Sequence, residues 1–277
     1  MRARALAILA LGIPVLAGLA YLLAYGAPPR YPAINGAALA IAALWIVVTP
    51  AFGRAVRRLT LGAALLLLFL PLVTGPWLGD VARWVPLGPF QLHAGMIAIP
   101  VIAVLAGQER DHAPALLSVA LLAALLQPDL ASCAALTLAA FGLYDATKDW
   151  RYGGFAIVAF VASLVAAVRG ELPAQPYVER VIFLLARTDP LAALGLVAAL
   201  VASFYLVIGT LPGTAASRKA LAGCLFGFSF AGLVSNYPSA LIGYGAAPIL
   251  GFGLALGWLA ANGRRLDDRT EDRPPAA

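Results

Sequence analysis

Long apolar runs separated by short polar segments constrain this chain more than any other feature of its sequence. A transmembrane helix needs about 20 consecutive apolar residues. Runs that reach or approach this length lie at 5–25, 33–53, 59–79, 92–107, 113–127, 130–144, 153–168, 182–210, 220–236 and 239–261. Of the 277 residues, 62% are hydrophobic and only 12% are charged, whereas a soluble domain is about half apolar and about a quarter charged. The sequence therefore predicts an all-α, polytopic transmembrane helical bundle with the lipid bilayer as its solvent.

The number of spans and their orientation follow from run length and from the basic residues. The runs at 92–107, 113–127 and 130–144 are short and could be re-entrant, so nine or eight spans are alternatives to ten. With ten spans and the N-terminus inside, fourteen of the 19 basic residues fall in inner loops and five in outer loops. The outer ones are Arg30, Arg83, Arg169, Arg180 and Arg187. Inner loops of membrane proteins are enriched in Lys and Arg, which predicts that both termini are cytoplasmic.

The short connections predict one transmembrane domain, residues 1–261, followed by a charged, disordered cytoplasmic tail, residues 262–277. The first run continues to Tyr25, too far for a signal-peptide core, so we expect it to remain as a helix. The arginine bias accounts for the net charge of +6, and no basic stretch predicts a nucleic-acid partner. Cys133 and Cys224 lie inside apolar runs, where thiols behave as small hydrophobic groups. Neither a metal-binding cluster nor a cofactor is evident.

Three polar segments, 80–91, 127–130 and 236–246, interrupt the runs, and the predicted topology places all three at the outer face. In the first, Trp84 would anchor the segment at the interface and Arg83 could meet a lipid phosphate; the alternative is an ordinary interfacial loop.

The other two polar segments also allow two interpretations each. Asp129, after Gln127-Pro128, fits the N-cap of the next helix, although a catalytic role is the alternative. Tyr244 stands between Gly243 and Gly245, which fits a helix entry or a broken helix that lines a cavity; close helix packing is the alternative.

The order of these motifs resembles that in a known family. The motifs are Arg83-Trp84 followed by Leu87-Gly88, then Gln127-Pro128-Asp129-Leu130, and last Pro238 with Gly243-Tyr244-Gly245-Ala246. They resemble the Arg-Trp loop, the Gln-Pro-Asp-Leu turn and the entry to the last helix of the SEDS family (shape, elongation, division and sporulation). Ile182-Phe183 is similar to that family's Phe-Ile-Phe segment. The resemblance covers about residues 80–261.

The resemblance implies a multi-pass protein of the bacterial cytoplasmic membrane that acts in peptidoglycan synthesis, cell shape or division. Its substrate would be lipid II, an undecaprenyl-linked precursor, and its partner a class B penicillin-binding protein. Polymerisation would need a carboxylate as general base, and cations or a divalent metal at the pyrophosphate. The substrate-binding residues implied here are Arg83, Trp84, Gln127, Asp129 and Tyr244.

Departures from the family pattern leave catalysis open. His93-Ala94-Gly95-Met96 stands where the family has a Glu and, beyond it, a Lys, and the long outer loop is shortened to about 169–181. Arg180 occupies the position of the family's catalytic Asp, so the neighbouring Glu179 is the candidate base, although a glutamate also suits a helix start. If the chain is active, it is a peptidoglycan glycosyltransferase.

Two other functions remain as hypotheses. One is a non-catalytic membrane partner or scaffold in envelope assembly. The other is an unrelated small-molecule transporter, which buried charges facing a midplane cavity would favour. Only Arg187 and Asp189 stand within a run as candidates for such charges.

Overall fold

The computed structural model describes residues 1–78, 81–109 and 111–271, with side chains to Ala261. Within these residues the chain forms eleven helices and one two-stranded antiparallel hairpin. The helices are α1 (Arg2–Ala24), α2 (Arg30–Val48), α3 (Arg54–Thr74), α4 (Ala94–Ala106), α5 (Ala113–Leu126), α6 (Leu130–Thr147), α7 (Trp150–Arg169), α8 (Val181–Thr188), α9 (Pro190–Gly209), α10 (Ala215–Val234) and α11 (Ala246–Glu271). The strands are β1 (Trp84–Leu87) and β2 (Phe90–His93).

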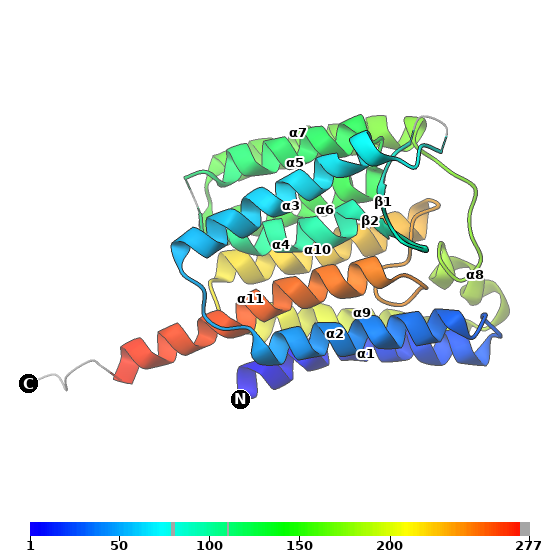
Figure 1. Ribbon diagram of the computed structural model, residues 1–277, viewed down its shortest axis with the longest axis horizontal. Helices are drawn as coiled ribbons and strands as arrows, with labels where there is room; N and C mark the ends of the chain where they lie inside the picture. Colours follow the sequence, from blue (N-terminus) through cyan, green and yellow to red (C-terminus); the bar gives the residue numbers. More distant parts are fainter. Residues whose placement is uncertain (79–80, 110, 272–277) are drawn as a thin grey trace, which may run out of the picture.

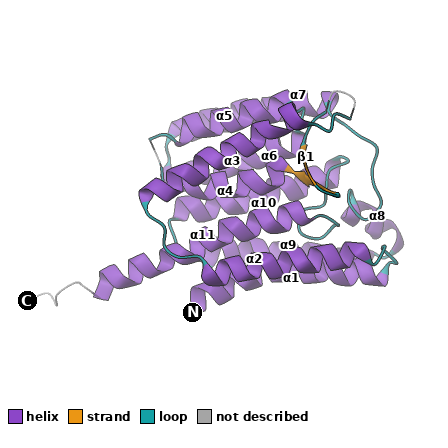
Figure 2. Ribbon diagram, viewed as in Figure 1, coloured by secondary structure: helices purple, strands orange, loops and turns teal. Residues whose placement is uncertain are grey.

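All the described helices except the short α8 run along one bundle (Figure 1). Helices α1, α2, α3, α6, α7 and α9 are long and apolar enough to cross a membrane, and α4, α5 and the segment Ala246–Ala261 are shorter apolar helices. The predicted fold class, a polytopic transmembrane helical bundle, is confirmed. Helix α1 begins and α11 ends at one end of the bundle, whereas the hairpin and α8 lie at the other end (Figures 1 and 2).

Three predicted boundaries were wrong. The run 182–210 is two helices, because Asp189 caps α9 by accepting the Ala192 N–H at 3.0 Å and Pro190 takes the first helical position. The last helix begins at Ala246 and not at 239, since the residues before it form turns.

The third wrong boundary is the start of the run 92–107. Residues 90–93 form strand β2, so α4 begins only at Ala94. Segment 80–91, interpreted from sequence as an interfacial loop, contains β1 and the hairpin turn, in which Trp84 pairs with His93 and Leu87 with Phe90.

The charged tail is only partly described. The backbone of α11 continues past Ala261 to Glu271, and residues 272–277 lie outside the described residues. The division into a domain at 1–261 and a disordered tail at 262–277 stays a prediction.

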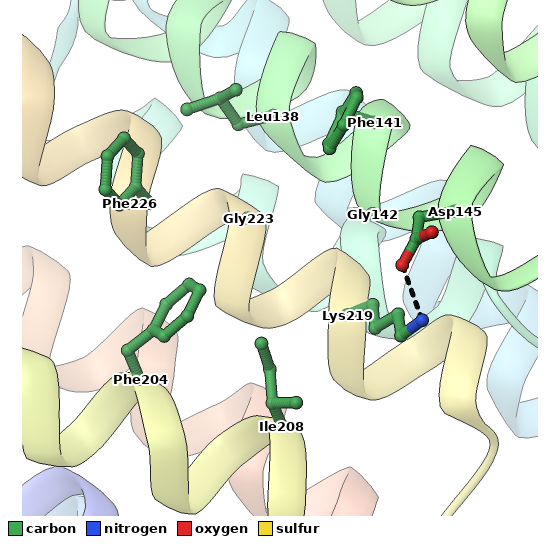
Figure 3. A pocket seen from close by; sticks show the side chains of 9 residues that line it. All are labelled: Leu138, Phe141, Gly142, Asp145, Phe204, Ile208, Lys219, Gly223 and Phe226. Carbon is green, nitrogen blue, oxygen red and sulfur yellow. Dashed lines mark hydrogen bonds and ion pairs between the residues drawn. The ribbon is translucent and has the colours of Figure 1, made fainter.

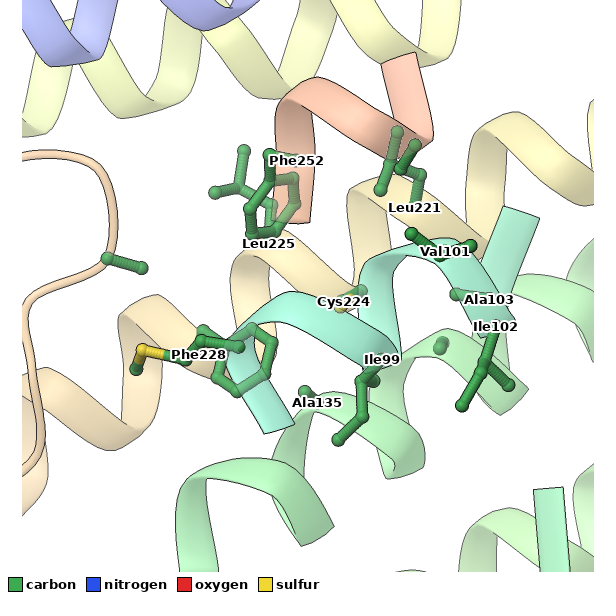
Figure 4. Packing of buried hydrophobic residues seen from close by; sticks show 14 of the residues in the cluster. Ile99, Val101, Ile102, Ala103, Ala135, Leu221, Cys224, Leu225, Phe228 and Phe252 are labelled. Carbon is green, nitrogen blue, oxygen red and sulfur yellow. The ribbon is translucent and has the colours of Figure 1, made fainter. Parts of the chain in front are cut away.

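Helix α4 lies at the centre of the bundle. It has only 13 residues, and all of them except Ile97 are buried. Helices α3, α6, α10 and α11 pack around it, and Figure 4 shows Ile99 and Ile102 of α4 among side chains that include Phe228 and Phe252. Because protein and not lipid surrounds α4, a helix shorter than the bilayer thickness is tolerated there.

Close packing of α6 on α10 depends on glycine. A Cβ atom at Gly223 would collide with the Leu138 carbonyl oxygen, and one at Gly227 with the backbone of Ala134 and Ala135. Small residues let two helices approach where lipid supplies no hydrophobic drive for association.

The outer surface of the bundle is apolar. Leu44 on α2, Val168 on α7 and Leu191 on α9 are 63%, 85% and 80% exposed. Large apolar side chains that are exposed on several helices suit a protein whose surroundings are lipid chains.

Candidate functional site

Arg83 is the centre of a buried polar cluster at the hairpin end of the bundle. It is only 2% exposed, and its guanidinium donates hydrogen bonds to the carbonyl oxygens of Gln127 (3.4 Å), Pro128 and Gly170. The guanidinium carbon also lies 4.6 Å from the ring centroid of Tyr237. Arg83 therefore ties the start of the hairpin to the turn before α6 and to the end of α7.

Asp129 caps α6, as the sequence predicted. Its Oδ1 accepts the Ser132 N–H at 3.1 Å, its Oδ2 accepts the Ser132 hydroxyl, and the residue is 1% exposed. Oδ2 also lies 3.6 Å from Nε2 of His93, whose Nδ1 accepts the Met96 N–H at 3.3 Å and so caps α4. The cluster thus joins the N-termini of two helices, where acceptors satisfy otherwise unpaired N–H groups.

Gln127 and Trp84 belong to the same region. The Gln127 amide donates to the Leu68 carbonyl oxygen of α3, and Gln127 is buried. Trp84 is half-buried, and its ring meets that of His93 edge-on at 6.1 Å. Four predicted substrate-binding residues therefore come together, in a closely packed cluster.

Tyr237 is a member of this cluster that the sequence analysis did not single out. Its hydroxyl accepts the Leu130 N–H at 3.0 Å and donates to the Pro128 carbonyl oxygen at 3.4 Å. A tyrosine next to a proline in the polar segment 236–246 was the available signal. We define the polar cluster as Arg83, His93, Gln127, Asp129 and Tyr237.

Tyr244 belongs to a separate group of tyrosines. Its ring stacks on that of Tyr31 at 3.7 Å and 5°, and its N–H donates to the Tyr177 carbonyl oxygen at 2.7 Å. Asn35 of α2 holds the surrounding turn, donating to the Gly243 carbonyl oxygen at 2.9 Å and accepting the N–H of the residue after Tyr244 at 3.0 Å. Tyr244 thus fixes the entry to α11 against α2.

Glu179, the candidate base, lies in the loop before α8. Its carboxylate accepts the Gln175 N–H of the same loop. Burial raises the pKa of the Glu179 carboxyl above its ordinary value, and the hydrogen bond from Gln175 opposes that rise. Among the described residues, no hydrogen bond or ion pair joins Glu179 to Arg83 or Asp129.

The segment after α10 connects these separate groups. Tyr237 lies in the polar cluster, while the Ser239 N–H donates to the Val178 carbonyl oxygen at 2.8 Å and the Ser239 hydroxyl accepts the Val181 N–H at 3.1 Å. The residue between them, Pro238, pairs with Glu179. The structure therefore holds the Glu179 loop beside the polar cluster without placing the carboxylate in it.

Two apolar cavities form a groove along α9 and α10. One has a volume of about 350 Å³ and begins at Ile182 of α8; the other has a volume of about 300 Å³, and both are lined by Phe204 and Phe226. Figure 3 shows these two rings beside the second cavity, with Lys219 and Asp145 at its other end. The Lys219 ammonium and the Asp145 carboxylate lie 2.5 Å apart. The groove thus extends from the hairpin end of the bundle toward the end where the chain begins.

A divalent metal at the pyrophosphate of a substrate stays a prediction. Within residues 1–78, 81–109 and 111–261, His, Cys, Asp and Glu side chains do not gather in groups of three or more that could hold one.

Comparisons with known proteins show which solved structures share this architecture. No protein-family model and no curated protein matches the chain. One similar structure is that of a mutant of the rod shape-determining protein RodA of Thermus thermophilus, in which alanine replaces an aspartate. It superposes with a TM-score of 0.73 over 93% of this chain and 96% of that one, at 19% identity. Unmutated RodA of that organism gives 0.68 over 93% and 95%, at 20% identity.

A third similar structure is a chain of a peptidoglycan synthase complex that coordinates polymerization and crosslinking. It gives a TM-score of 0.63 over 95% of this chain and 98% of that one, at 20% identity. The likeness covers almost the whole chain in each case. This protein therefore has the fold of the SEDS proteins, as the order of its motifs predicted.

Proposed function

We propose that this protein acts in peptidoglycan synthesis as a SEDS-type protein of the bacterial cytoplasmic membrane, where it binds the undecaprenyl-linked precursor lipid II. The observation that carries the proposal is the RodA-like fold over 93% of the chain. The apolar groove beside α8 supports it, because a polyprenyl chain needs an apolar surface at bilayer depth. A class B penicillin-binding protein is the proposed partner.

The distribution of buried charge argues against the transporter alternative. In the described part of the chain, the buried charged side chains other than histidine are Arg83, Glu109 and Asp129. Each lies just outside a helix and not within one. A transport path would place ionisable groups near the middle of the membrane.

Polymerisation by this chain would use Glu179 as general base. The carboxylate would take the proton from a sugar hydroxyl as that oxygen attacks C1 of the lipid-linked sugar and the lipid diphosphate leaves. The alternative is a non-catalytic partner. The Glu179 carboxylate is hydrogen-bonded within its own loop, which favours this alternative. The resemblance at Ile182-Phe183 also favours it, because it implies that Arg180 occupies the position of the family's acid.

The test is lipid II binding and polymerisation by purified protein, with and without a class B penicillin-binding protein. If the chain is catalytic, Glu179→Gln should lower turnover by about 10²–10⁴-fold. The acidic limb of the rate profile should then lie above the ordinary glutamate range, because burial raises the pKa of Glu179. Glu171→Gln is the matched control, since Glu171 is an exposed acid in the same loop.

Three outcomes decide between these functions. Lipid II binding without glycan product in either form establishes the non-catalytic alternative. Polymerisation that is insensitive to Glu179→Gln removes Glu179 from the mechanism. Absence of lipid II binding to the unsubstituted protein refutes the proposed function as a whole.

A further inference from the structure

Two arginines share one aromatic ring on α8. The guanidinium carbons of Arg180 and Arg187 each lie 4.3 Å from the ring centroid of Phe183. The two positive charges are therefore separated by no more than twice that distance. Arg180 takes a left-handed backbone conformation (φ 53°) just before α8, and Arg187 lies in the last turn.

Neither arginine has an acceptor within the part of the chain that the structure describes. Nε of Arg180 is buried without a hydrogen-bond partner, and neither guanidinium forms an ion pair with a carboxylate. The nearby Asp189 instead accepts the Tyr25 hydroxyl at 2.6 Å and caps α9. Two like charges held close together without a counter-ion repel each other, and a buried donor without an acceptor costs free energy.

An anion with several oxygens would relieve both costs. Arginine binds phosphate through two parallel N–H···O bonds, and such charge-assisted bonds are about twice as strong as neutral ones. Two guanidinium groups within this distance suit adjacent phosphates that carry more than one negative charge. Arg83 cannot fill this role as well, since its donors go to backbone carbonyl oxygens inside the polar cluster.

The groove supplies the apolar half of the site. Ile182 follows Arg180 by two residues and opens the cavity of about 350 Å³, which continues between α9 and α10 along Val197, Val201 and Leu225. The second cavity extends this path, because Phe204 and Phe226 line both. The adjoining cavities together offer an apolar path for a lipid chain.

We propose that Arg180 and Arg187 hold the diphosphate of a polyprenyl diphosphate lipid whose chain lies in the groove between α9 and α10. The inference rests on the proposed function and assigns the residues that bind the charged part of its substrate. A phospholipid fits less well, because its single phosphodiester charge matches one guanidinium and leaves the other without a partner.

The experiment measures binding of undecaprenyl diphosphate to the purified full-length protein in detergent micelles by microscale thermophoresis. Each of Arg180→Gln and Arg187→Gln should weaken binding by about tenfold, and the double variant by about 100-fold, the range expected for loss of charge-assisted hydrogen bonds. Arg169→Gln removes one exposed arginine at the same end of the bundle and should leave binding unchanged. Undecaprenol, phosphatidylglycerol and inorganic pyrophosphate are the comparison ligands, and each should bind more weakly than undecaprenyl diphosphate.

The outcomes separate this inference from the proposed function. If the unsubstituted protein binds undecaprenyl diphosphate and lipid II and the double variant binds them equally well, the arginine site is refuted and the proposed function stands. If phosphatidylglycerol binds as tightly as undecaprenyl diphosphate and is lost in the double variant, the site is a phospholipid site and the inference fails. If neither prenyl lipid binds the unsubstituted protein, both fail. Arg187 is exposed, so Arg187→Gln tests the site without disturbing the fold.

Discussion

Replacing Arg83 with methionine should destabilise the protein, because the arginine is structural in this bundle. The substitution keeps an unbranched side chain of similar length but removes the donors to the carbonyl oxygens of Gln127, Pro128 and Gly170. Each hydrogen bond to a charged group contributes about 1.5–3 kcal/mol to the free energy of unfolding. The cation–π contact with Tyr237 adds up to about 2 kcal/mol when it is desolvated.

Part of this stabilisation is offset by the cost of burying the guanidinium itself. The substitution leaves three buried carbonyl oxygens without their donor, at about 1–3 kcal/mol each, and it removes the cost of burying the guanidinium, so we expect a net loss of about 3–5 kcal/mol. A change of 1 kcal/mol shifts Tm by about 2–4 °C in chains of 150–250 residues. We therefore expect Arg83→Met to lower the apparent Tm by about 6–20 °C.

Two buried cysteines can report the unfolding of the bundle. Cys133 and Cys224 are free and buried, so a thiol-reactive fluorescent dye labels them only as the bundle opens. The measurement is the apparent Tm at one fixed heating rate in detergent, since irreversible unfolding depends on the rate. Arg83→Lys keeps the positive charge but lacks the planar guanidinium with its several donors, so it should recover only part of the lost Tm.

Arg169→Met is the matched control, because Arg169 is exposed at the same end of the bundle. An Arg83→Met protein that unfolds within about 2 °C of the unsubstituted protein, less than the shift expected for 1 kcal/mol, would refute the structural role. If that protein also lost lipid II binding, Arg83 would instead be a substrate ligand, as the family resemblance implied.

Two further predictions concern packing and topology. Gly223→Ala should lower the free energy of unfolding by about 1–3 kcal/mol, because the added Cβ is overpacked against the Leu138 carbonyl oxygen. At Gly62 a Cβ meets nothing within 4 Å, so Gly62→Ala should leave the apparent Tm unchanged or slightly raised. Equal Tm values for these two variants would contradict the close approach of α6 and α10. A reporter fused after Ala277 should be active only in the cytoplasm, and activity on the outer side would overturn the predicted topology.

Features that depend on neighbouring residues could be predicted from the sequence. The apolar runs specified the bundle helices, because a backbone in lipid must satisfy its hydrogen bonds within each segment. Asp129 was recognised as a cap because capping uses N–H groups only a few residues away. The same reasoning, applied to Asp189-Pro190, would have found the break between α8 and α9, which the apolar character of the run concealed.

Features that depend on contacts between distant segments were decided only by the tertiary structure. The interfacial neighbours of Arg83 in the sequence allowed either a lipid-phosphate contact or an ordinary interfacial loop, yet its acceptors come from residues 44 to 87 positions away. Tyr237 joins the polar cluster through a residue 107 positions distant.

The pair Arg180 and Arg187 flanks Phe183 at helical spacing, which the sequence already contains. The groove beside it is formed by α9 and α10, which no local pattern places next to α8. Local patterns specify each helix and its caps, whereas the partners of a buried charge depend on which helices the bundle brings together.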